Sequence, residues 1–465
     1  MVMAGGRGRR LGALTCHRSK PAVPFGGRYR IIDFVLSNFI NSGYRRIFVL
    51  TQFMASSLIK HISRNWRLSG IGEFVEIVPP QMRVGEFWYR GTADSVYQNL
   101  NLIRDERAEH VAVFGGDHIY TFAIDQMDEF HRDLGADLTV AACPVPTSEA
   151  NRFGIIAVDA AGHITGFLEK PSNPPEMPGR PGWSLASMGN YIFRAGSLIE
   201  SLVATIEQEG TRYDFGRDVV PRMVEQGARV MAYDFATSVI PGAAPGTAPY
   251  WRDVGTIDSY YEANMDMRAR LPELNVYNRR WRIHAAQRDF PAARVVRHGP
   301  AGKPAVLVDS MLCEGSIVAS AKLSEVLLGF DCFVHSGAEI HESVILSGCD
   351  IGAGSRLRKV LLDKNCKIDP GVVIGEDPEA DRKRFPYITE GGVVVLPKGT
   401  LVTRDRVQLA YDIASMLRKD DDTREPLDLL GDAVAVSTSD RHSYDSAGPR
   451  YARFAPHGPD GPELP

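Results

Sequence analysis

A glycine-rich turn near the start of the chain could hold phosphate. The segment A-G-G-R-G-R-R-L at residues 4–11 follows a short apolar run and leads to K-P-A at residues 20–22. Glycines let backbone N–H groups approach phosphate oxygens without a Cβ in the way, and Arg10 and Lys20 would add charge-assisted contacts. A glycine turn alone indicates little more than a tight turn. With this arginine and lysine, it predicts that Gly5, Gly6 and Gly8 contact a triphosphate.

Charged residues also follow two apolar runs further along the chain. Asp117 comes after residues 111–114, where a carboxylate at the end of a strand could hold Mg²⁺ against phosphate oxygens; a helix cap or turn is the alternative. Glu169 and Lys170 end another apolar run, where they could contact a ligand; an ordinary surface ion pair is the alternative. Only Lys20, Lys60 and Lys170 precede residue 303 in a chain that otherwise uses Arg. Retained lysines indicate positions that need a compact charge.

These side chains need a sheet to position them. Short apolar runs predict strands at residues 47–51, 74–78, 111–115, 138–143, 155–158 and 190–193, and helical patterns lie between them, as at 95–107 and 125–133. Strands that alternate with helices favour a parallel α/β sheet. Such sheets bind ligands beyond the carboxyl ends of their strands.

A second domain is expected because 465 residues exceed what one hydrophobic core usually serves. From about residue 300, apolar residues recur every six positions, which predicts a parallel β-helix with about 18 residues in each coil. Four cysteines are spaced by about one coil and are expected to stack as small buried side chains; a ladder of ligands is the alternative. The residues in phase are Ile317 and Leu323, then Ile345, Ile351 and Leu357, then Leu362, Ile368 and Ile374; the cysteines are Cys313, Cys332, Cys349 and Cys366.

Composition limits the classes of partner. The formal net charge is −4 and no long basic run occurs, which argues against a nucleic-acid partner. No apolar run approaches the roughly 20 residues of a membrane span, and the start of the chain lacks the apolar segment of a signal peptide. The cysteines form no C-x-x-C pair, so a zinc site is not indicated. Free thiols fit a reducing cytoplasm.

Further motifs complete a recognisable pattern. They are W-Y-R-G-T-A-D at 88–94, G-D-H-I-Y at 116–120, F-L-E-K-P at 167–171, S-M-G at 187–189, D-F-G at 214–216 and Y-W-R-D-V-G-T at 250–256. With the phosphate turn, they resemble the bacterial glucose-1-phosphate adenylyltransferase (ADP-glucose pyrophosphorylase) family over residues 1 to about 410. The phosphate turn is shared by all sugar nucleotidyltransferases, whereas the segments at 88–94 and 250–256 are more specific to this branch.

The resemblance implies an α/β fold in two domains. We expect a Rossmann-like nucleotidyltransferase domain at residues 1–272, a linker at 273–299 and a left-handed parallel β-helix at 300–410, followed at 411–465 by a helix and a disordered tail. The implied reaction transfers adenylyl from ATP to glucose 1-phosphate with Mg²⁺. It gives ADP-glucose and pyrophosphate, the glucosyl-donor step of glycogen or other α-glucan synthesis. A homotetramer regulated by small anionic metabolites is also implied.

The same resemblance assigns roles to individual residues. Arg10, Lys20, Asp117 and Lys170 would be catalytic, and Asp117 and Asp253 would hold the metal. Gly5, Gly6, Gly8, Gln52, Gly91 and Thr92 would bind the nucleotide, whereas Tyr89, Gly154, Glu169, Lys170 and Ser187 would bind the sugar phosphate. Gln52 and Trp88 lie where the family couples effector and active sites. Arg18 and Arg30 are candidate contacts for an anionic effector, with exposed surface arginines as the alternative. Two positions depart from the family pattern: Arg9 replaces Thr or Ser, and His17 stands where some members have an activator-binding Lys.

Three alternatives stay open at this point. The first is a nucleotidyltransferase that uses UTP, GTP or dTTP. The second is a non-catalytic regulatory subunit of the same fold, against which the presence of Arg10, Lys20, Asp117, Lys170 and Asp253 argues. The third is a hexapeptide-repeat acyltransferase, for which His335 and His341 offer no convincing catalytic context.

Overall fold

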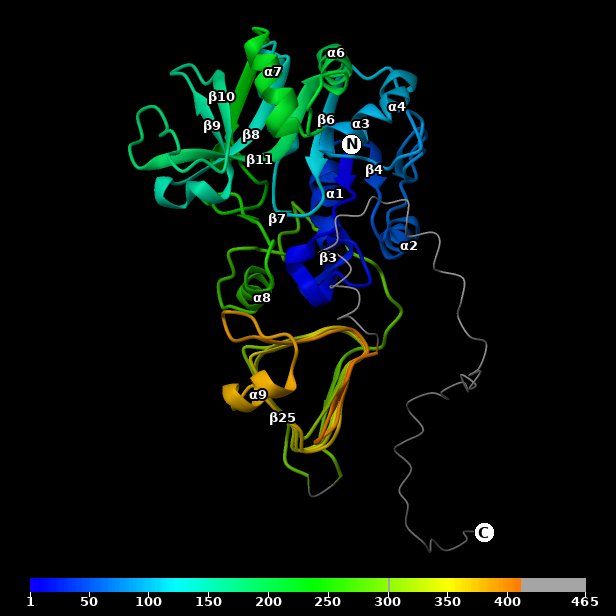
Figure 1. The fold of residues 1–465 in the computed structure, drawn as a ribbon. Coiled ribbons are helices and arrows are strands. Elements are labelled where there is room, and N and C mark those ends of the chain that lie inside the picture. The colour runs from blue at the N-terminus through cyan, green and yellow to red at the C-terminus, as the bar shows by residue number, and fades with distance from the viewer. Residues whose placement is uncertain (300–301, 411–465) are drawn as a thin grey trace, which may run out of the picture. The chain divides into compact units, whose positions relative to one another are not determined.

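The first part of the chain forms a nine-stranded sheet. The computed structural model describes residues 1–299 and 302–410, so the helix and tail predicted at 411–465 lie outside the described residues. The strand order is β10-β9-β11-β6-β1-β4-β5, and β8 pairs with both β11 and β12 (Figure 1). The strands are β1 (Val2–Ala4), β4 (Arg46–Thr51), β5 (Phe74–Val78), β6 (His110–Gly115), β8 (Leu138–Pro146), β9 (Gly154–Val158), β10 (Ile164–Glu169), β11 (Trp183–Arg194) and β12 (Val230–Asp234).

The sheet is mixed rather than wholly parallel. Strands β5, β4, β1 and β6 run parallel, as the alternating pattern predicts. Strand β11 runs antiparallel to β6, β8 and β9, and β9 and β10 form an antiparallel pair. Only a short turn joins β9 to β10, and parallel neighbours need a longer crossover connection. The six strand segments that the sequence pattern predicted fall within six of the nine strands, but the pattern predicted neither β1, β10 and β12 nor the antiparallel directions.

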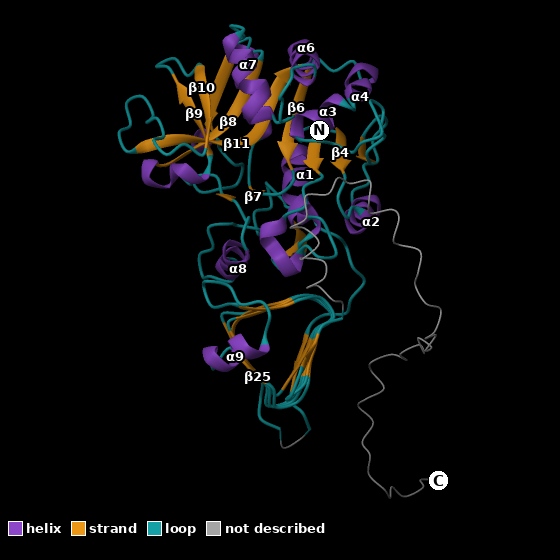
Figure 2. Ribbon diagram, in the orientation of Figure 1, coloured by secondary structure: helices purple, strands orange, loops and turns teal. Residues whose placement is uncertain are grey.

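Helices cover both faces of the sheet (Figure 2). Buried side chains of β6 alternate between two hydrophobic clusters: Val111 and Val113 face one, and Ala112 and Phe114 face the other. Such alternation is expected of a strand covered on both sides. The helices are α1 (Ile31–Asn41), α2 (Ser56–Asn65), α3 (Thr92–Tyr97), α4 (Leu100–Asp105), α5 (Ile124–Asp133), α6 (Ala195–Ile206), α7 (Val220–Glu225) and α8 (Ile257–Asp266).

The second part of the chain is a parallel β-helix. One of its sheets stacks β17 (Ile317–Ala319), β19 (Phe333–Val334), β21 (Asp350–Ile351), β24 (Lys367–Ile368) and β27 (Leu401–Val402), and β14 (Arg294–Val296) pairs with β17. A second sheet includes β15 (Val306–Val308), β18 (Lys322–Leu328), β20 (Glu339–Ile345), β23 (Val360–Leu362), β25 (Val373–Ile374) and β26 (Val394–Leu396). Between β25 and β26 the chain forms α9 (Pro378–Arg384).

The predicted six-residue phase is confirmed at seven of its eight positions. Those seven side chains are at most 1% exposed, but Ile317 is only partly buried. Val318 takes its place in the core because it is in register with Val334, which in turn pairs with Ile351. Strand β17 is therefore offset by about one residue from the phase that the sequence predicted.

Three of the four β-helix cysteines stack as predicted. Cys332, Cys349 and Cys366 are each at most 1% exposed. Burial, followed by hydrogen bonding with the thiols of its two neighbours, raises the pKa of Cys349 well above its ordinary value. The prediction is wrong for Cys313, because the coil that begins at β17 is shorter than the coil above it: Ile317 pairs with Phe333, whereas Phe333 pairs with Asp350. Ser316 therefore lies beneath Cys332, and the Cys332 N–H donates to the Ser316 Oγ at 3.1 Å.

The two parts of the chain share a hydrophobic cluster. Leu11, Leu14 and Val254 of the first part pack in it with Leu361 and Val393 of the β-helix. Within the described residues, no helix combines the length and apolar character needed to cross a bilayer.

Candidate active site

The phosphate turn lies at the carboxyl end of β1, where the sheet predicts a ligand site. Gly8 has φ 65°, and a Cβ there would lie 2.7 Å from the Cβ of Lys20. A Cβ at Gly5 would lie 3.0 Å from the Cβ of Gln52. Side chains at these positions would displace the lysine or the neighbouring strand, so the sequence needs glycine here.

Lys20 joins the two carboxylates that the sequence assigns to a metal. Its Nζ lies 3.1 Å from Asp117 Oδ2 and 3.3 Å from Asp253 Oδ1, and its side chain is only 6% exposed. Burial alone would raise the pKa of Asp117, but the nearby His118 and Lys20 hold that pKa well below its usual range. Arg10 reaches the same group, with Nη2 4.0 Å from Asp253 Oδ2. Residues separated by 233 positions in the chain thus converge on one point.

The chemistry of this group fits a divalent cation. Two carboxylates already share one cation, and carboxylate oxygens are the ligands that Mg²⁺ prefers. No cluster of three or more His, Cys, Asp or Glu side chains suited to a metal occurs in residues 1–299 and 302–410. Mg²⁺ commonly takes one or two protein carboxylates and completes its shell with phosphate oxygens and water. Asp117 and Asp253 match that arrangement.

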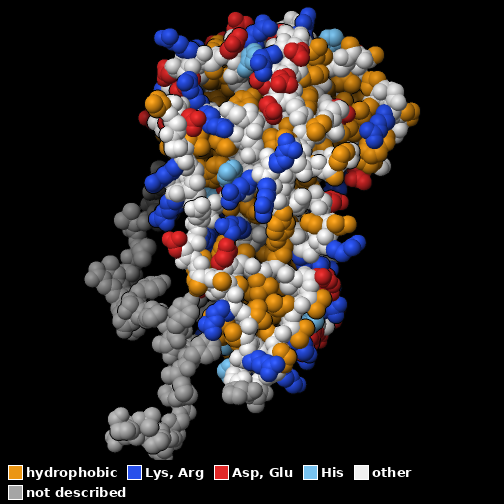
Figure 3. Space-filling view, turned by 180° about the vertical axis from the view of Figure 1, so that it is seen from behind, with side chains coloured by type: hydrophobic (Ala, Val, Ile, Leu, Met, Phe, Trp, Pro, Cys, Tyr) orange, Lys and Arg blue, Asp and Glu red, His pale blue; other side chains and the backbone are white. Residues whose placement is uncertain are grey.

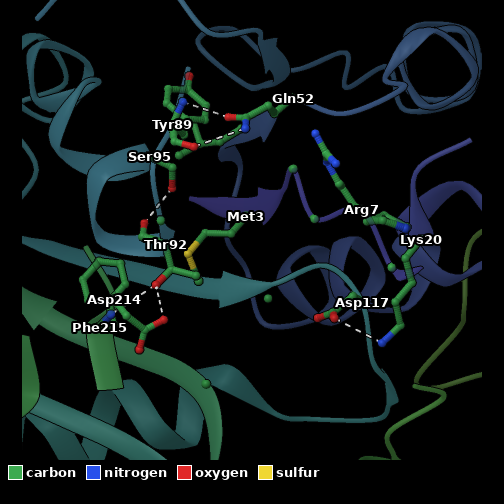
Figure 4. A pocket seen from close by; sticks show the side chains of 18 of the residues that line it. Met3, Arg7, Lys20, Gln52, Tyr89, Thr92, Ser95, Asp117, Asp214 and Phe215 are labelled. Carbon is green, nitrogen blue, oxygen red and sulfur yellow. Dashed lines mark hydrogen bonds and ion pairs between the residues drawn. The ribbon is translucent and has the colours of Figure 1, made fainter. Parts of the chain in front are cut away.

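A cavity of about 710 Å³ lies over the phosphate turn (Figure 4). It is large enough for a nucleotide, since ligand pockets usually measure about 300–1,000 Å³. Ten of the predicted site residues line it: Gly5, Gly6, Gly8, Arg10, Lys20, Gln52, Tyr89, Gly91, Thr92 and Asp117. Asp253 contacts the cavity wall through Lys20.

One side of the cavity is built from β4 and the segment before α3. Gln52 accepts from the Tyr89 N–H at 2.9 Å and donates to the Tyr89 carbonyl oxygen at 3.2 Å. Figure 4 shows this pair well separated from Lys20 and Asp117. The Tyr89 hydroxyl accepts from Asn99 at 2.8 Å, and Trp88 is 51% exposed. Tyr89, predicted to contact the sugar phosphate, therefore shares its side of the cavity with Gln52.

Apart from Tyr89, the predicted sugar-phosphate residues lie on β9, β10 and β11 or directly after β10. Lys170 Nζ is 3.5 Å from Glu169 Oε1 at the end of β10, and Arg217 Nη2 is 3.4 Å from the same oxygen. A Cβ at Gly154 would lie 3.1 Å from Glu169 Oε2. Ser187 accepts from the Gly189 N–H at 3.3 Å. None of Gly154, Glu169, Lys170 or Ser187 lines the cavity, although Met188 and Tyr191 beside Ser187 do.

The predicted regulatory arginines lie away from the cavity, beside the β-helix. Arg18 makes a bidentate ion pair with Asp363 at 3.0 and 2.8 Å. Arg30 donates to the Ser57 backbone and hydroxyl at 2.8 and 2.9 Å. Burial, and then the charges of Arg30, Arg18 and Arg288, lower the pKa of Lys364 to about 7. Three arginines thus lie near Lys364, and one of them, Arg18, pairs with Asp363. Figure 3 shows Lys and Arg side chains gathered across the middle of the rear face.

The cavity wall contains a second charged group that the sequence pattern did not predict. Arg90 pairs with buried Asp94 at 3.0 Å and lies over the rings of Phe87 and Tyr213. Thr92 donates to Asp214 at 3.0 Å, and Asp214 in turn accepts from two N–H groups of the following helical turn. Both groups fall within the quoted motifs at 88–94 and 214–216. The spacing of four between Arg90 and Asp94 is a signal that could have revealed the first pair.

Comparison with known proteins agrees with this geometry. Residues 1–270 match the nucleotidyl transferase family, and residues 291–396 match the GlmU-like C-terminal hexapeptide family, whose repeat builds the left-handed β-helix. The chain is 46% identical to a glucose-1-phosphate adenylyltransferase of Anaeromyxobacter sp. (strain Fw109-5) over 405 residues, covering 86% of this chain and 98% of the relative. Similar relatives bearing that name occur in Photobacterium profundum, at 44% identity with 86% and 98% covered, and in Deinococcus deserti, at 46% with 86% and 97% covered. The chain belongs to the glucose-1-phosphate adenylyltransferase family.

Proposed function

We propose that this chain transfers the adenylyl group of ATP to glucose 1-phosphate, releasing pyrophosphate and forming ADP-glucose. Family membership supports the activity. The single structural observation that supports it best is the contact of Lys20 with both Asp117 and Asp253 beneath a glycine-lined cavity of about 710 Å³. We further propose the domain limits of residues 1–272 and 300–410, joined by a linker at 273–299 whose strand β14 adds to a sheet of the β-helix. ADP-glucose would supply glycogen or a related α-glucan.

The reaction needs alignment and charge neutralisation more than a protein nucleophile. A phosphate oxygen of glucose 1-phosphate attacks the α-phosphorus of ATP, and the bond from that phosphorus to the bridging oxygen breaks as pyrophosphate leaves. The Gly5–Gly8 backbone, Arg10 and Lys20 hold the triphosphate in line for this attack. Gln52, Gly91 and Thr92 contact the nucleoside. Asp117 and Asp253 would hold Mg²⁺, which when bound would neutralise charge on the phosphate oxygens.

The acceptor is held by residues of β9, β10 and β11. Lys170 binds the phosphate of glucose 1-phosphate, and Glu169 accepts hydrogen bonds from the sugar hydroxyls. Gly154 leaves room beside Glu169, since a Cβ there would crowd that carboxylate. Ser187 and Tyr89 complete the contacts to the sugar phosphate.

The decisive experiment measures pyrophosphate release from ATP and glucose 1-phosphate with Mg²⁺. A panel of ATP, UTP, GTP and dTTP distinguishes the proposed base from its rivals. ATP should support the fastest release, and Lys20→Ala should abolish most of it. If pyrophosphate is released with UTP, GTP or dTTP but not with ATP, the proposed nucleotide is wrong. If none of the four supports release, the proposed function is wrong.

Regulation by small anions is supported by the cation cluster beside the β-helix. Arg30, Arg18 and Arg288 lie close enough to Lys364 that their charges add to burial in lowering its pKa, and Asp363 only partly offsets them. An anionic metabolite bound beside Lys364 would offset the charges of these three arginines. Gln52 and Trp88 would transmit that binding to the cavity, which Gln52 lines. A rate that no sugar phosphate or carboxylate metabolite alters would contradict this part.

Assembly into a homotetramer is supported by the first turn of the β-helix. Strands β14 and β15 end their sheets, and neither has a partner on its outer side within the described residues. Val295, Val306, Leu307 and Val308 on these strands are 36–47% exposed, which is a substantial apolar edge. A second copy of the chain would cover it. Light scattering should show a smaller particle for Val306→Lys with Val308→Lys.

The compartment is proposed from the thiols. All six cysteines are free, and three of them stack within the β-helix. Free stacked thiols fit a reducing compartment such as the cytoplasm.

A further inference from the structure

The β-helix makes a buried ionic contact next to the active-site lysine. Arg18 Nη1 and Nη2 donate to Asp363 Oδ1 and Oδ2 at 3.0 and 2.8 Å, and the two side chains are 5% and 0% exposed. Asp363 directly follows β23, and Arg18 lies two residues before Lys20. Bidentate pairing fixes the guanidinium in both position and orientation. The backbone that carries Lys20 is therefore attached to a coil of the β-helix.

A second contact reaches the segment that carries Asp253. Thr389, in the loop between α9 and β26, donates through Oγ1 to Asp258 Oδ1 at 2.5 Å, and the Gly391 N–H donates to Asp258 Oδ2 at 3.3 Å. Asp258 lies in the first turn of α8, and the next residue, Ser259, donates to the carbonyl oxygen of Asp253 at 2.6 Å. The chain of contacts thus runs from the β-helix to the backbone of Asp253, whose side chain belongs to the active site.

Apolar packing surrounds both contacts. The cluster shared by the two parts contains Leu14 from the Lys20 side and Val254 from the Asp253 side, packed with Leu361 and Val393 of the β-helix. All four side chains are at most 1% exposed. Since closely packed interiors transmit displacements rather than absorb them, a shift of the β-helix would move both segments.

We infer that the β-helix sets the distance between Lys20 and Asp253, with Asp363 and Thr389 acting as positioning residues for adenylyl transfer. The two attached segments meet where Lys20 Nζ contacts Asp117 and Asp253, at 3.1 and 3.3 Å. This inference rests on the proposed function, because it takes Lys20 and Asp253 as parts of the reacting site. Neither Asp363 nor Thr389 lines the cavity, so their effect acts through the residues they hold.

The size of the effect follows from the geometry of in-line transfer. A misplacement of about 1 Å can lower a rate by about 100-fold even when the change lies far from the chemistry. Loss of one of two attachments should move the site by less. We therefore expect kcat to fall by about 10- to 100-fold for either contact. The KM for glucose 1-phosphate should stay unchanged, because Glu169 and Lys170 belong to β10 and the segment just after it and are not held by these contacts.

The test uses the full chain without any effector. Arg18→Met with Asp363→Leu removes both charges, because a double apolar replacement keeps stability better than a single change that leaves one buried charge. Thr389→Val removes the hydroxyl with little change of shape, and Thr389→Ser restores it. The control is Lys322→Met with Glu339→Leu, which removes an ion pair of 2.7 Å from the exposed surface of the β-helix. Each variant is measured for melting temperature, kcat and both KM values.

The inference is supported if kcat falls in the Arg18/Asp363 and Thr389→Val variants but stays normal in Thr389→Ser and in the control. The KM for glucose 1-phosphate should stay unchanged in all of them. A folded Arg18/Asp363 variant with wild-type kcat would overturn it, as would an equal loss in the control. If the double variant does not fold, Thr389→Val decides: wild-type kcat there refutes the positioning role. Lys20→Ala, assayed alongside, separates the two proposals, since its full activity would refute the site itself.

Discussion

Replacing Asp117 with Asn tests the proposed chemistry most directly, because it removes a charge and keeps the shape. In the structure, Asp117 accepts from Lys20 at 3.1 Å, and Lys20 keeps Asp253 as a second partner at 3.3 Å. The ammonium group is therefore not left unpaired by the change. The Asp117 side chain is 42% exposed, and ion pairs with an exposed member contribute about 0–1 kcal/mol to stability. The melting temperature should change little.

Turnover should change far more than stability. Removing one charged or polar group aimed at charge in the transition state commonly lowers kcat by about 100- to 1,000-fold, equivalent to about 2.7–4 kcal/mol. Asn at position 117 keeps one side-chain oxygen but loses the negative charge. Its contact with the proposed Mg²⁺ and its hold on the Lys20 ammonium group should both weaken. We expect a loss of kcat in that range, with a melting temperature close to that of the unchanged chain.

The assay follows pyrophosphate release from ATP, glucose 1-phosphate and Mg²⁺ at saturating substrate, with thermal unfolding measured on the same samples. Asp133→Asn is the matched control, since Asp133 lies exposed at the end of α5 and does not line the cavity. It should behave like the unchanged chain. Asp117→Asn with more than half of the normal kcat would refute the assignment of this carboxylate. A large loss shared with Asp133→Asn would show an indirect effect instead.

Lys170→Ala should mainly raise the KM for glucose 1-phosphate, because Lys170 is proposed to bind the phosphate of that substrate. The fold should not change, since the Lys170 side chain is 60% exposed; an unchanged KM would remove Lys170 from the site. Arg30→Ala should weaken the response to an anionic effector in initial-rate assays while the rate without effector stays normal. Lys364→Met should change stability with pH. The pKa of Lys364 is about 7 in the fold and about 10.4 unfolded, so the unfolded chain binds more protons between these values, and the free energy of unfolding rises with pH across them. That rise, measured by denaturant titration, should shrink in Lys364→Met.

The periodicity of apolar residues made many strands and helices predictable. Some of their ends were not, because side chains there form hydrogen bonds that compete with the helix backbone. The run at 74–78 matches β5 at both ends. The helix predicted at 95–107 is instead divided into α3 and α4 at Gln98 and Asn99. Asn99 donates through its amide to the Ser95 carbonyl oxygen and to the Tyr89 hydroxyl, and its backbone leaves the helical region. Such local bonding by Asn competes with helix continuation, and the partner Tyr89 cannot be known from the sequence pattern alone.

Some features of the candidate site were likewise predictable from the sequence, and others were not. The glycines and the lysine of the phosphate turn predicted a phosphate site, because few other roles require both residue types together. The structure brings Lys20, Asp117 and Asp253 into contact. The partner of Arg18 could not be predicted, because Asp363 lies 345 positions away and only the β-helix stacking brings it close. The sequence suggested an effector contact for Arg18, yet its guanidinium already pairs with a buried carboxylate.

Arg18 therefore connects the two proposals made for this chain. Asp363 pairs with Arg18, and through it holds the backbone next to Lys20; Arg18 in turn lies close enough to Lys364 to act on its pKa. An anion bound to Arg30 and Lys364 would also attract Arg18 and so compete with Asp363 for it, since Coulomb attraction in a partly buried site is weakly screened. Effector binding and the position of Lys20 would then share one ion pair. On this reasoning the Arg18→Met, Asp363→Leu variant should lose basal turnover and effector response together, whereas Arg30→Ala should lose the response alone.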